Sequence, residues 1–282
     1  MGAGRSGTTL LDIMLGNNPD VFSAGELNRF SKENGKPVNV EENSRTARFW
    51  NNFRTNLPGE IHSGMPGSLH RVCSMFEYHT GLIMSVLPFK TSSFGYYKTY
   101  ISAFFNTLSS MVRQPVIVDS SKYPMRGYFM SQILKNEMVF IYVKRNPLDV
   151  VKSFEKKDVE QPSKSWLGSN LYLLVVNLIC RFVLAKLRKN HKTITIYYHE
   201  LISKPQDTLT RIGKELQIDV TESVRIAENG YSFKPGFLFD GNRIRLESEI
   251  FLSTSERKTQ ASGIKDQLTL FIQGLWWNKK IA

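Results

Sequence analysis

The residues with the clearest chemical potential stand at the start of the chain, in a glycine-rich segment. Residues 2–11 read GAGRSGTTLL, and Gly2 and Gly7 have the G-x4-G spacing of a phosphate-binding loop before an amphipathic helix. Glycine lets the backbone curl so that successive N–H groups point inward, and the helix N-terminus adds partial positive charge. The segment therefore predicts an anion cradle, formed by Gly4, Arg5, Ser6, Gly7, Thr8 and Thr9.

This loop differs from that of the nucleotide triphosphatases at one decisive position. Thr8 stands where those proteins carry their lysine, and Arg5 supplies a cation from inside the loop. Without that lysine, the loop is poorly suited to transfer between β- and γ-phosphates with magnesium. It is well suited to binding a single 5′-phosphate. For the motif taken alone, a plain glycine-rich turn before a helix is the alternative.

A second set of polar residues follows an apolar run at residues 139–143. Arg145 comes at the expected strand end, Pro147 opens a helix, and Ser153 falls about two turns into that helix. A guanidinium and a hydroxyl that converge there suit a second phosphate, because arginine can bind phosphate with two parallel hydrogen bonds. Each residue singly would be an ordinary surface residue, but the pair beside an anion loop favours a second anion site.

The elements that must position these residues alternate between strands and helices. Short apolar runs at residues 21–23, 116–118, 139–143 and 193–198 end in polar residues, as buried parallel strands do. Helical patterns cover residues 8–16, 96–112, 124–135, 147–157, 164–189 and 205–216. The alternation predicts an α/β fold with a parallel sheet flanked by helices on both faces. We expect a single domain over residues 1–282, with a helical or irregular insertion at about residues 34–112.

The start of the chain is unusual for such a fold. A phosphate loop normally follows a buried strand, and here the loop already begins at Gly2. The missing strand would be the central one, and its loss would leave unpaired backbone groups at a cost on the order of several kcal/mol. We therefore expect that the first central strand is missing from this chain, as in a fragment or a start assigned too late.

Composition limits the partners and the compartment. The chain has 37 Lys and Arg against 25 Asp and Glu, a net charge of +12, and 41% hydrophobic residues, which excludes a disordered protein and predicts an anionic partner. Cys73 and Cys180 are far apart, which favours a reducing compartment, and we expect the cytoplasm. The histidine spacing predicts no metal site. Residues 171–185 are apolar but short and contain Asn177 and Arg181, which predicts a core helix and no membrane span.

Together the two motifs resemble those of the sulfotransferases that use 3′-phosphoadenosine 5′-phosphosulfate (PAPS). Residues 2–11 resemble the 5′-phosphosulfate loop of that family, in the arginine form of its tyrosylprotein, carbohydrate and bacterial members. Arg145 and Ser153 resemble its 3′-phosphate site. Two weaker matches are residues 198–201, YHEL against Y-E-D-L, and residues 241–245, GNRIR against G-N-P-x-R. Residues 34–112 have no counterpart.

The resemblance implies an enzyme that moves a sulfuryl group from PAPS to an acceptor hydroxyl and leaves adenosine 3′,5′-bisphosphate. Loop amides would hold the 5′ end of the donor, Arg5 would lie over the breaking bond, and Arg245 would reach the nucleotide. Protein cations can replace magnesium because a sulfuryl group carries less negative charge than a phosphoryl group, so no metal is expected. A carbohydrate or small metabolite is the expected acceptor, and the net charge is compatible with an anionic glycan.

The resemblance also suggests two residues for the chemistry. Glu26, after the run at residues 21–23, matches the catalytic base, and Lys122, after the run at residues 116–118, matches the lysine that stabilises the sulfuryl oxygens. Glu26 as a helix cap and Lys122 as a solvated residue of a capping turn are the alternatives. His62 or His70 would be the base if Glu26 is not.

Other functions stay open at this point. A P-loop nucleotide kinase is the rival enzyme, and the absent loop lysine argues against it. A basic nucleic-acid-binding module would explain the charge, but no RNP or helix-turn-helix pattern is present, and we expect no nucleic-acid partner. An inactive, truncated relative that only binds nucleotides is the third alternative.

Overall fold

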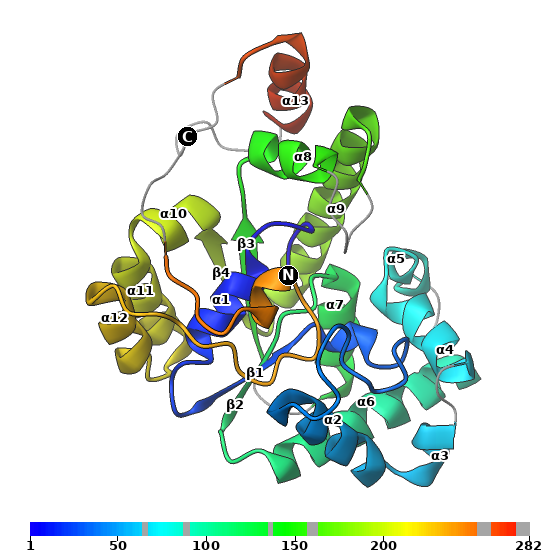
Figure 1. Ribbon diagram of the computed structural model, residues 1–282. Coiled ribbons are helices and arrows are strands. Elements are labelled where there is room, and N and C mark those ends of the chain that lie inside the picture. The colour runs from blue at the N-terminus through cyan, green and yellow to red at the C-terminus, as the bar shows by residue number, and fades with distance from the viewer. Residues whose placement is uncertain (64–66, 87–90, 135–137, 157–162, 253–260, 275–282) are drawn as a thin grey trace.

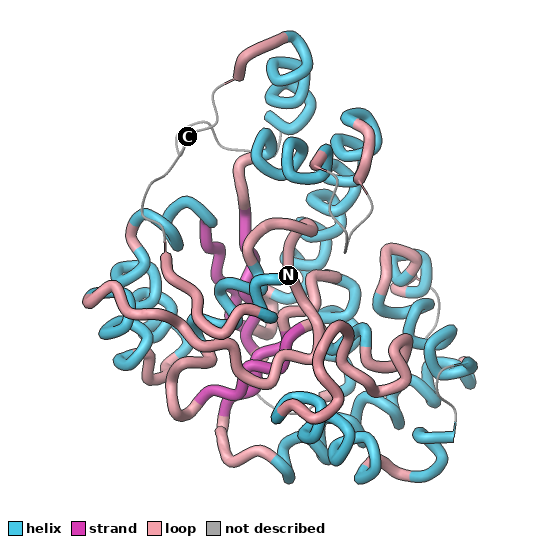
Figure 2. Tube along the Cα trace, in the orientation of Figure 1, coloured by secondary structure: helices cyan, strands magenta, loops and turns pink. Residues whose placement is uncertain are grey.

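Short parallel sheets form the centre of the molecule. The computed structural model describes residues 1–63, 67–86, 91–134, 138–156, 163–252 and 261–274. Within them β1 (Val21–Gly25) pairs with β2 (Val116–Asp119), and β3 (Val139–Lys144) pairs with β4 (Lys192–Tyr197), both in parallel. Helices surround these two sheets (Figures 1 and 2). The predicted α/β class is therefore confirmed, and the four predicted strands are present with one or two residues of difference at their ends.

The first residues of the chain lie between the two sheets. The Met1 amino group donates to the carbonyl of Ile141 at 2.6 Å, and the Val143 N–H donates to the Met1 carbonyl at 3.0 Å. On the other side, the Gly2 N–H donates to the carbonyl of Lys122 at 3.1 Å. The glycine loop therefore begins at the carboxyl ends of β2 and β3, where ligand sites of α/β folds assemble.

The helices that carry the predicted motifs form where the sequence pattern places them. They are α1 (Thr8–Leu15), α7 (Pro124–Ile133), α8 (Pro147–Glu155), α9 (Trp166–Leu187) and α11 (Pro205–Leu216). Proline occupies the first turn of α7, α8 and α11, where its missing N–H costs nothing. The expected ends at residues 135 and 157 lie outside the described residues. The remaining elements after β4 are α10 (Tyr198–Ser203), α12 (Thr221–Glu228), η2 (Arg243–Leu246) and α13 (Ile264–Gly274).

The region predicted as an insertion, at about residues 34–112, is more helical than its weak periodicity indicates. After η1 (Leu27–Arg29) come α2 (Arg45–Asn56), α3 (Gly59–Ser63), α4 (Gly67–Glu77), α5 (Gly81–Met84) and α6 (Ser92–Met111). Trp50, Phe53 and Phe76 from these helices are almost fully buried in one cluster with Phe22 of β1 and Phe129 of α7. The region therefore shares the main hydrophobic core, and Figure 1 shows its helices beside β1 and α7.

A second cluster fixes the helix that follows the glycine loop. Every residue of α1 is buried, and Ile13 and Met14 pack in a cluster that includes Ile196 of β4 and Leu209 of α11. Because α1 is enclosed along its length, the loop in front of it has a rigid base.

Candidate active site

The glycine loop has the geometry of an anion cradle. Gly7 precedes α1 with φ 97°, and a Cβ there would lie 2.3 Å from the ring of Tyr198, so only glycine fits without strain. The side chains of Ser6 and Thr8 are 1% and 6% exposed, and neither hydroxyl has a hydrogen-bond partner among the described residues. Buried hydroxyls without partners at a helix N-terminus fit a bound anion.

The second motif contacts the loop directly. The Arg145 side chain donates through Nη1 to the carbonyl of Arg5 at 2.9 Å, and Arg5 donates through Nη1 to Oγ of Ser153 at 3.3 Å. The Arg145 guanidinium lies over the ring of Tyr198 at 4.3 Å, the same ring that contacts Gly7. Two motifs that are 140 residues apart in sequence therefore form one basic site.

A small cavity opens beside this contact. Residues from the loop, β3, α8, α9 and α13 line it, among them Ser6, Lys144 and Arg145. Burial lowers the pKa of Lys144, and nearby Arg181 adds to the effect. Cationic and hydroxyl side chains thus share one recess at the carboxyl end of β3.

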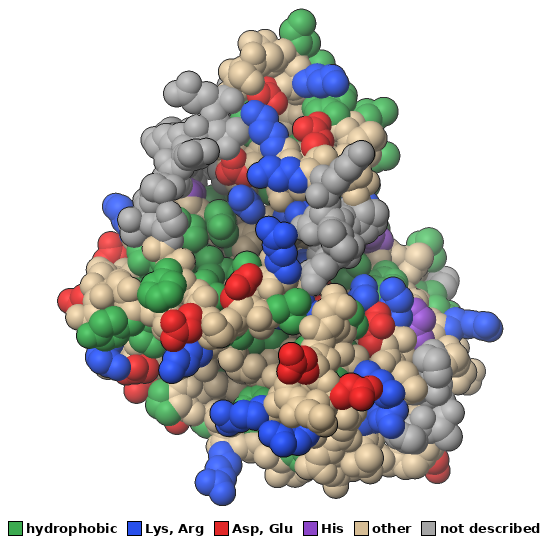
Figure 3. Space-filling model, viewed as in Figure 1, with side chains coloured by type: hydrophobic (Ala, Val, Ile, Leu, Met, Phe, Trp, Pro, Cys, Tyr) green, Lys and Arg blue, Asp and Glu red, His purple; other side chains and the backbone are tan. Residues whose placement is uncertain are grey.

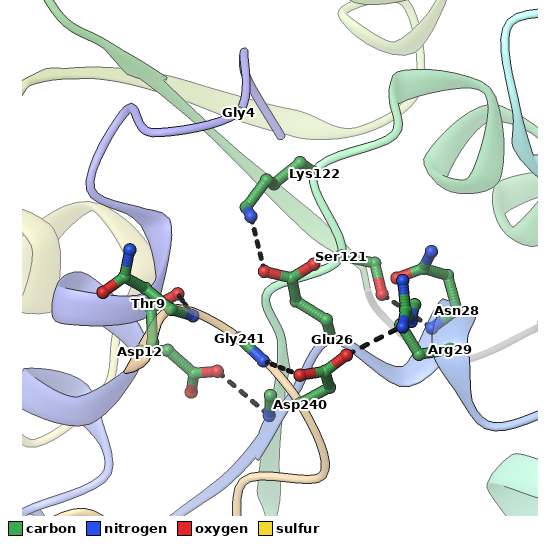
Figure 4. Close-up of polar contacts among 12 residues, drawn as sticks. Gly4, Thr9, Asp12, Glu26, Asn28, Arg29, Ser121, Lys122, Asp240 and Gly241 are labelled. Atoms are coloured by element: carbon green, nitrogen blue, oxygen red, sulfur yellow. Dashed lines mark hydrogen bonds and ion pairs between the residues drawn. The ribbon is translucent and has the colours of Figure 1, made fainter. Parts of the chain in front are cut away.

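Glu26 and Lys122 form a close ion pair on the other side of the loop. The Nζ of Lys122 lies 2.6 Å from Oε1 of Glu26, and the two side chains are only 14% and 12% exposed. Figure 4 shows Lys122 between the loop at Gly4 and the carboxylate of Glu26. The two residues proposed from the sequence for chemistry therefore meet, although 96 positions separate them.

Residues 1–222 match the model of a family described as the sulfotransferase family. The chain belongs to this family. It is similar to the sulfotransferase domain from the curacin biosynthetic pathway, with a TM-score of 0.53, 14% identity, and coverage of 97% of this chain and 95% of that one. It is also similar to the sulfotransferase domain from the Synechococcus PCC 7002 olefin synthase, with a TM-score of 0.50, 17% identity, and coverage of 98% and 93%. At these identities the likeness shows the fold alone. No curated protein sequence matches the chain.

Family membership supports sulfuryl transfer as the activity of this sulfotransferase. The matched residues include the glycine loop, Glu26, Lys122 and the Arg145–Ser153 pair, whereas η2 and α13 lie beyond residue 222. Among the described residues, no group of three His, Cys, Asp or Glu side chains is placed to hold a metal ion.

Asp12 positions Glu26 and was missed by the sequence analysis. Its carboxyl group accepts the Ser23 hydroxyl at 2.6 Å and the Gly25 N–H at 3.0 Å, so α1 holds the end of β1 directly before Glu26. Burial raises the pKa of Asp12 to about 7, against the opposing effect of these hydrogen bonds. The sequence feature that could have indicated this role is the single acidic residue inside the otherwise uncharged segment TTLLDIML.

A loop after α12 also holds the end of β1. The Glu26 N–H donates to the carbonyl of Asp240 at 2.9 Å, and the Asp240 carboxylate pairs with Arg29 and Arg245, each at 3.2 Å. The Arg245 guanidinium also donates to the carbonyl of Val38 at 2.7 Å. Arg245 is therefore buried in a structural junction, and its predicted contact with the nucleotide stays a prediction.

Thr9 contacts the same loop. Its hydroxyl accepts the N–H of Asn242 at 3.0 Å, which attaches the loop to the first turn of α1. Its predicted role in donor binding also stays a prediction. Arg243 is exposed on η2.

Aromatic side chains from α9 and from two connecting segments form a group beside the glycine loop. Tyr172 of α9 accepts the N–H of Gly4 at 2.9 Å through its hydroxyl, and its ring centroid lies 6.2 Å from that of His79. His79 in turn lies 5.7 Å from Tyr123, which lies 4.6 Å from Tyr78. Burial lowers the pKa of His79, which favours its neutral form. No local pattern predicts this grouping, because its members come from distant parts of the chain.

The structure describes the side chain of only one of the two alternative bases predicted from the sequence, and that residue, His70, makes none of the ring contacts of this group. His70 lies on α4 near the Ser74 hydroxyl, and burial lowers its pKa. The side chain of His62 lies outside the described residues.

A buried ionic network supports the segment that carries Lys122. Arg126 of α7 pairs through Nε with Asp119 at 2.9 Å and through Nη1 with Glu77 of α4, which also accepts the hydroxyl of Tyr97 at 3.1 Å. Arg126 and Glu77 are 3% and 2% exposed. The network connects α4, α6 and α7 to the end of β2, three residues before Lys122.

Proposed function

We propose that this sulfotransferase transfers a sulfuryl group from PAPS to a hydroxyl of a carbohydrate or small-metabolite acceptor. The observation that carries the proposal is the contact between Arg145 and the loop carbonyl of Arg5, beside the unpartnered hydroxyls of Ser6 and Thr8. A loop with buried hydroxyls, next to Arg145 and to the hydrogen bond from Arg5 to Ser153, suits a nucleotide with phosphate groups at both its 5′ and 3′ positions.

Different residues would bind the two ends of the donor nucleotide. The backbone amides of the loop and the hydroxyls of Ser6 and Thr8 would hold the 5′ end, and Arg145 with Ser153 would hold the 3′-phosphate. Arg5 belongs to the loop that would hold the 5′ end. Its guanidinium lies next to Ser153 and over the ring of Phe154 at 5.4 Å, so it would connect the 5′ and 3′ sites. Binding would use donors that are already desolvated, which lowers the cost of replacing water by phosphate.

Transfer requires a base and a cation near the reacting atoms. The acceptor oxygen would form a bond to sulfur while the bond from sulfur to the 5′-phosphate breaks, and the acceptor proton would move to Glu26. In the protein without substrate, the ammonium group of Lys122 contacts the carboxylate of Glu26. An acceptor hydroxyl would displace this ammonium group from the carboxylate. The released ammonium group would then stabilise the sulfuryl oxygens, and Arg5 the leaving phosphate. These cations supply the charge stabilisation that magnesium provides in phosphoryl transfer.

The aromatic side chains near the loop support a carbohydrate acceptor. The flat faces of Tyr123 and Tyr172 suit the apolar face of a sugar ring, and their hydroxyls suit its polar rim. Lys164 lies 5.5 Å from the ring of Tyr172 and 5.9 Å from that of Phe154, so a cation is available for a carboxylate or sulfate on the acceptor.

Donor binding tests the proposal directly. In a thermal-shift titration with adenosine 3′,5′-bisphosphate, we expect the melting temperature to rise by several degrees at about 100 times Kd. The Arg145→Ala variant should raise Kd roughly tenfold or more, because a hydrogen-bonded charge is lost. Arg225→Ala, a change to an exposed arginine on α12, is the matched control and should titrate like wild type. A chain that binds ATP with magnesium but ignores the bisphosphate would contradict the proposal and favour a kinase.

A further inference from the structure

The exposed face of α9 is apolar, although the opposite face of the same helix is already in the core. Leu167, Leu171, Val175 and Leu178 recur at helical spacing and are 65%, 60%, 37% and 43% exposed. A helix that is apolar on all sides is normally buried or in contact with a membrane. By length and hydropathy α9 could cross a membrane, but 44% of its most apolar window is buried inside the fold.

The helix α13 packs on α9 with its polar side inward. The hydroxyl of Thr269 accepts the indole N–H of Trp166 at 2.9 Å, and the amide of Gln273 donates to the carbonyl of Asn170 at 3.0 Å. Both Thr269 and Gln273 are fully buried. On its outer side α13 exposes apolar residues at i, i+4 and i+7, namely Ile264, Leu268 and Phe271, which are 77%, 44% and 81% exposed.

We call the exposed apolar residues of these two helices the apolar stripes. They are Leu167, Leu171, Val175 and Leu178 on α9, and Ile264, Leu268 and Phe271 on α13. Figure 3 shows hydrophobic side chains gathered at the end of the molecule where α13 and the start of α9 lie in Figure 1. Exposed apolar side chains that gather in this way mark a site of interaction. Because the polar side chains of α13 face inward, the part of the chain that the structure describes leaves the stripes exposed.

The charges beside the stripes indicate what covers them. Residues 166–189 contain no Asp or Glu, and Arg181, Lys186, Arg188 and Lys189 are exposed at the later turns of α9 and just after it. A second copy of the chain would bring the same cations and a further net charge of +12, which opposes self-association. An anionic lipid surface attracts such cations, at about 1 kcal/mol for each Lys or Arg near the headgroups.

We propose that α9 and α13 dock this protein on the surface of a bilayer that contains anionic lipids. The apolar stripes would enter the boundary between headgroups and acyl chains, and the cations of α9 would contact the headgroups. Because the opposite face of α9 packs in the core, the helix lies along the surface and keeps its place in the fold.

Vesicle co-sedimentation of the full chain tests this proposal without any measurement of turnover. With vesicles of phosphatidylcholine and phosphatidylserine we expect binding that weakens as salt is raised, and roughly tenfold weaker binding to phosphatidylcholine alone. The double variant Leu171→Gln with Leu178→Gln, and separately Phe271→Gln, should each weaken binding to the mixed vesicles roughly tenfold. Ile83→Gln, at a position on α5 that is 64% exposed, is the matched control and should bind like wild type.

Three results would overturn the proposal. The first is equal binding by the stripe variants and wild type, and the second is equal binding to neutral and anionic vesicles. The third is a wild-type dimer in analytical ultracentrifugation that the stripe variants lose, together with no vesicle binding, since this would assign the stripes to a second copy. Thermal melts of each variant establish that it is folded, and the substituted positions are exposed, so all variants are expected to fold.

Discussion

The ammonium group of Lys122 lies 2.6 Å from the carboxylate of Glu26, with both side chains largely withdrawn from water. A buried pair of this kind is costly to break by removing one partner only, because the other charge is left uncompensated. The pair therefore couples the two proposed reactive groups in the resting protein. Substitutions at the two positions should separate a role in chemistry from a role in folding.

Glu26→Gln should keep donor binding and lose transfer. We expect adenosine 3′,5′-bisphosphate to raise the melting temperature as in wild type, and the transfer rate with PAPS to fall roughly 10²- to 10⁴-fold, as for loss of a general base. The measurement is release of the bisphosphate in the presence of an accepted hydroxyl compound. Full activity in this variant would exclude Glu26 as the base and would favour the alternative, His62 or His70.

Lys122→Met should also reduce transfer, for a different reason. The methionine side chain keeps the apolar stem but leaves the sulfuryl oxygens without their cation, so kcat should fall with little change in the Kd of the bisphosphate. Equal losses of kcat and of bisphosphate affinity would instead indicate that the side chain of Lys122 only maintains the donor site, through its ion pair with Glu26.

Gly7→Ala should damage the loop itself. Position 7 has φ 97°, and the added Cβ would meet the Tyr198 ring, so we expect a loss of roughly 2 kcal/mol or more in the free energy of unfolding. The thermal shift with the bisphosphate should disappear as well. Gly95→Ala is the matched control, since a Cβ at that position of α6 would meet no heavy atom within 4 Å beyond its chain neighbours and the backbone of its own helix. That change should stabilise the protein by about 0.5 kcal/mol.

The pH dependence of stability should report on Asp12. Burial raises its pKa to about 7 from an ordinary value of 3.8, so between these pH values the folded chain retains a proton that the unfolded chain releases. The free energy of unfolding should therefore fall as pH rises from about 4 to 7, by roughly 1.4 kcal/mol per pH unit from this group, and level off above that. Denaturant titrations at pH 5 and pH 7.5 should show a smaller decrease for Asp12→Asn than for wild type. Equal decreases in both proteins would contradict the assignment.

Arg126→Met should destabilise the fold strongly. The change leaves the buried carboxylates of Glu77 and Asp119 without their shared cation, a loss of about 3–5 kcal/mol in the free energy of unfolding. Chemical denaturation measures it. Arg211→Met breaks an exposed pair with Glu200 and should cost less than about 1 kcal/mol. Similar losses in the two variants would mean that the network around Arg126 is not a major support.

Much of the site was predictable because its rules are local. The spacing of Gly2 and Gly7 before α1 indicates an anion loop, and the positions of Arg145 and Ser153 follow from a strand end and a proline that opens a helix. The helices between residues 34 and 91 were less predictable. Those helices, α2 to α5, have 12 residues or fewer, and a short helix carries a weak periodic signal.

Local sequence patterns establish the α/β class, the strands that end at the site, and the residue types available there, because these depend on backbone preferences and on patterns within a few turns. Tertiary structure alone decided that Lys122 pairs with Glu26, that Tyr172 supports Gly4, and that Asp240 holds the end of β1. It also decided which sides of α9 and α13 meet. Contacts between residues about 100 or more positions apart depend on how the clusters of the core pack together, and no short-range pattern encodes that packing.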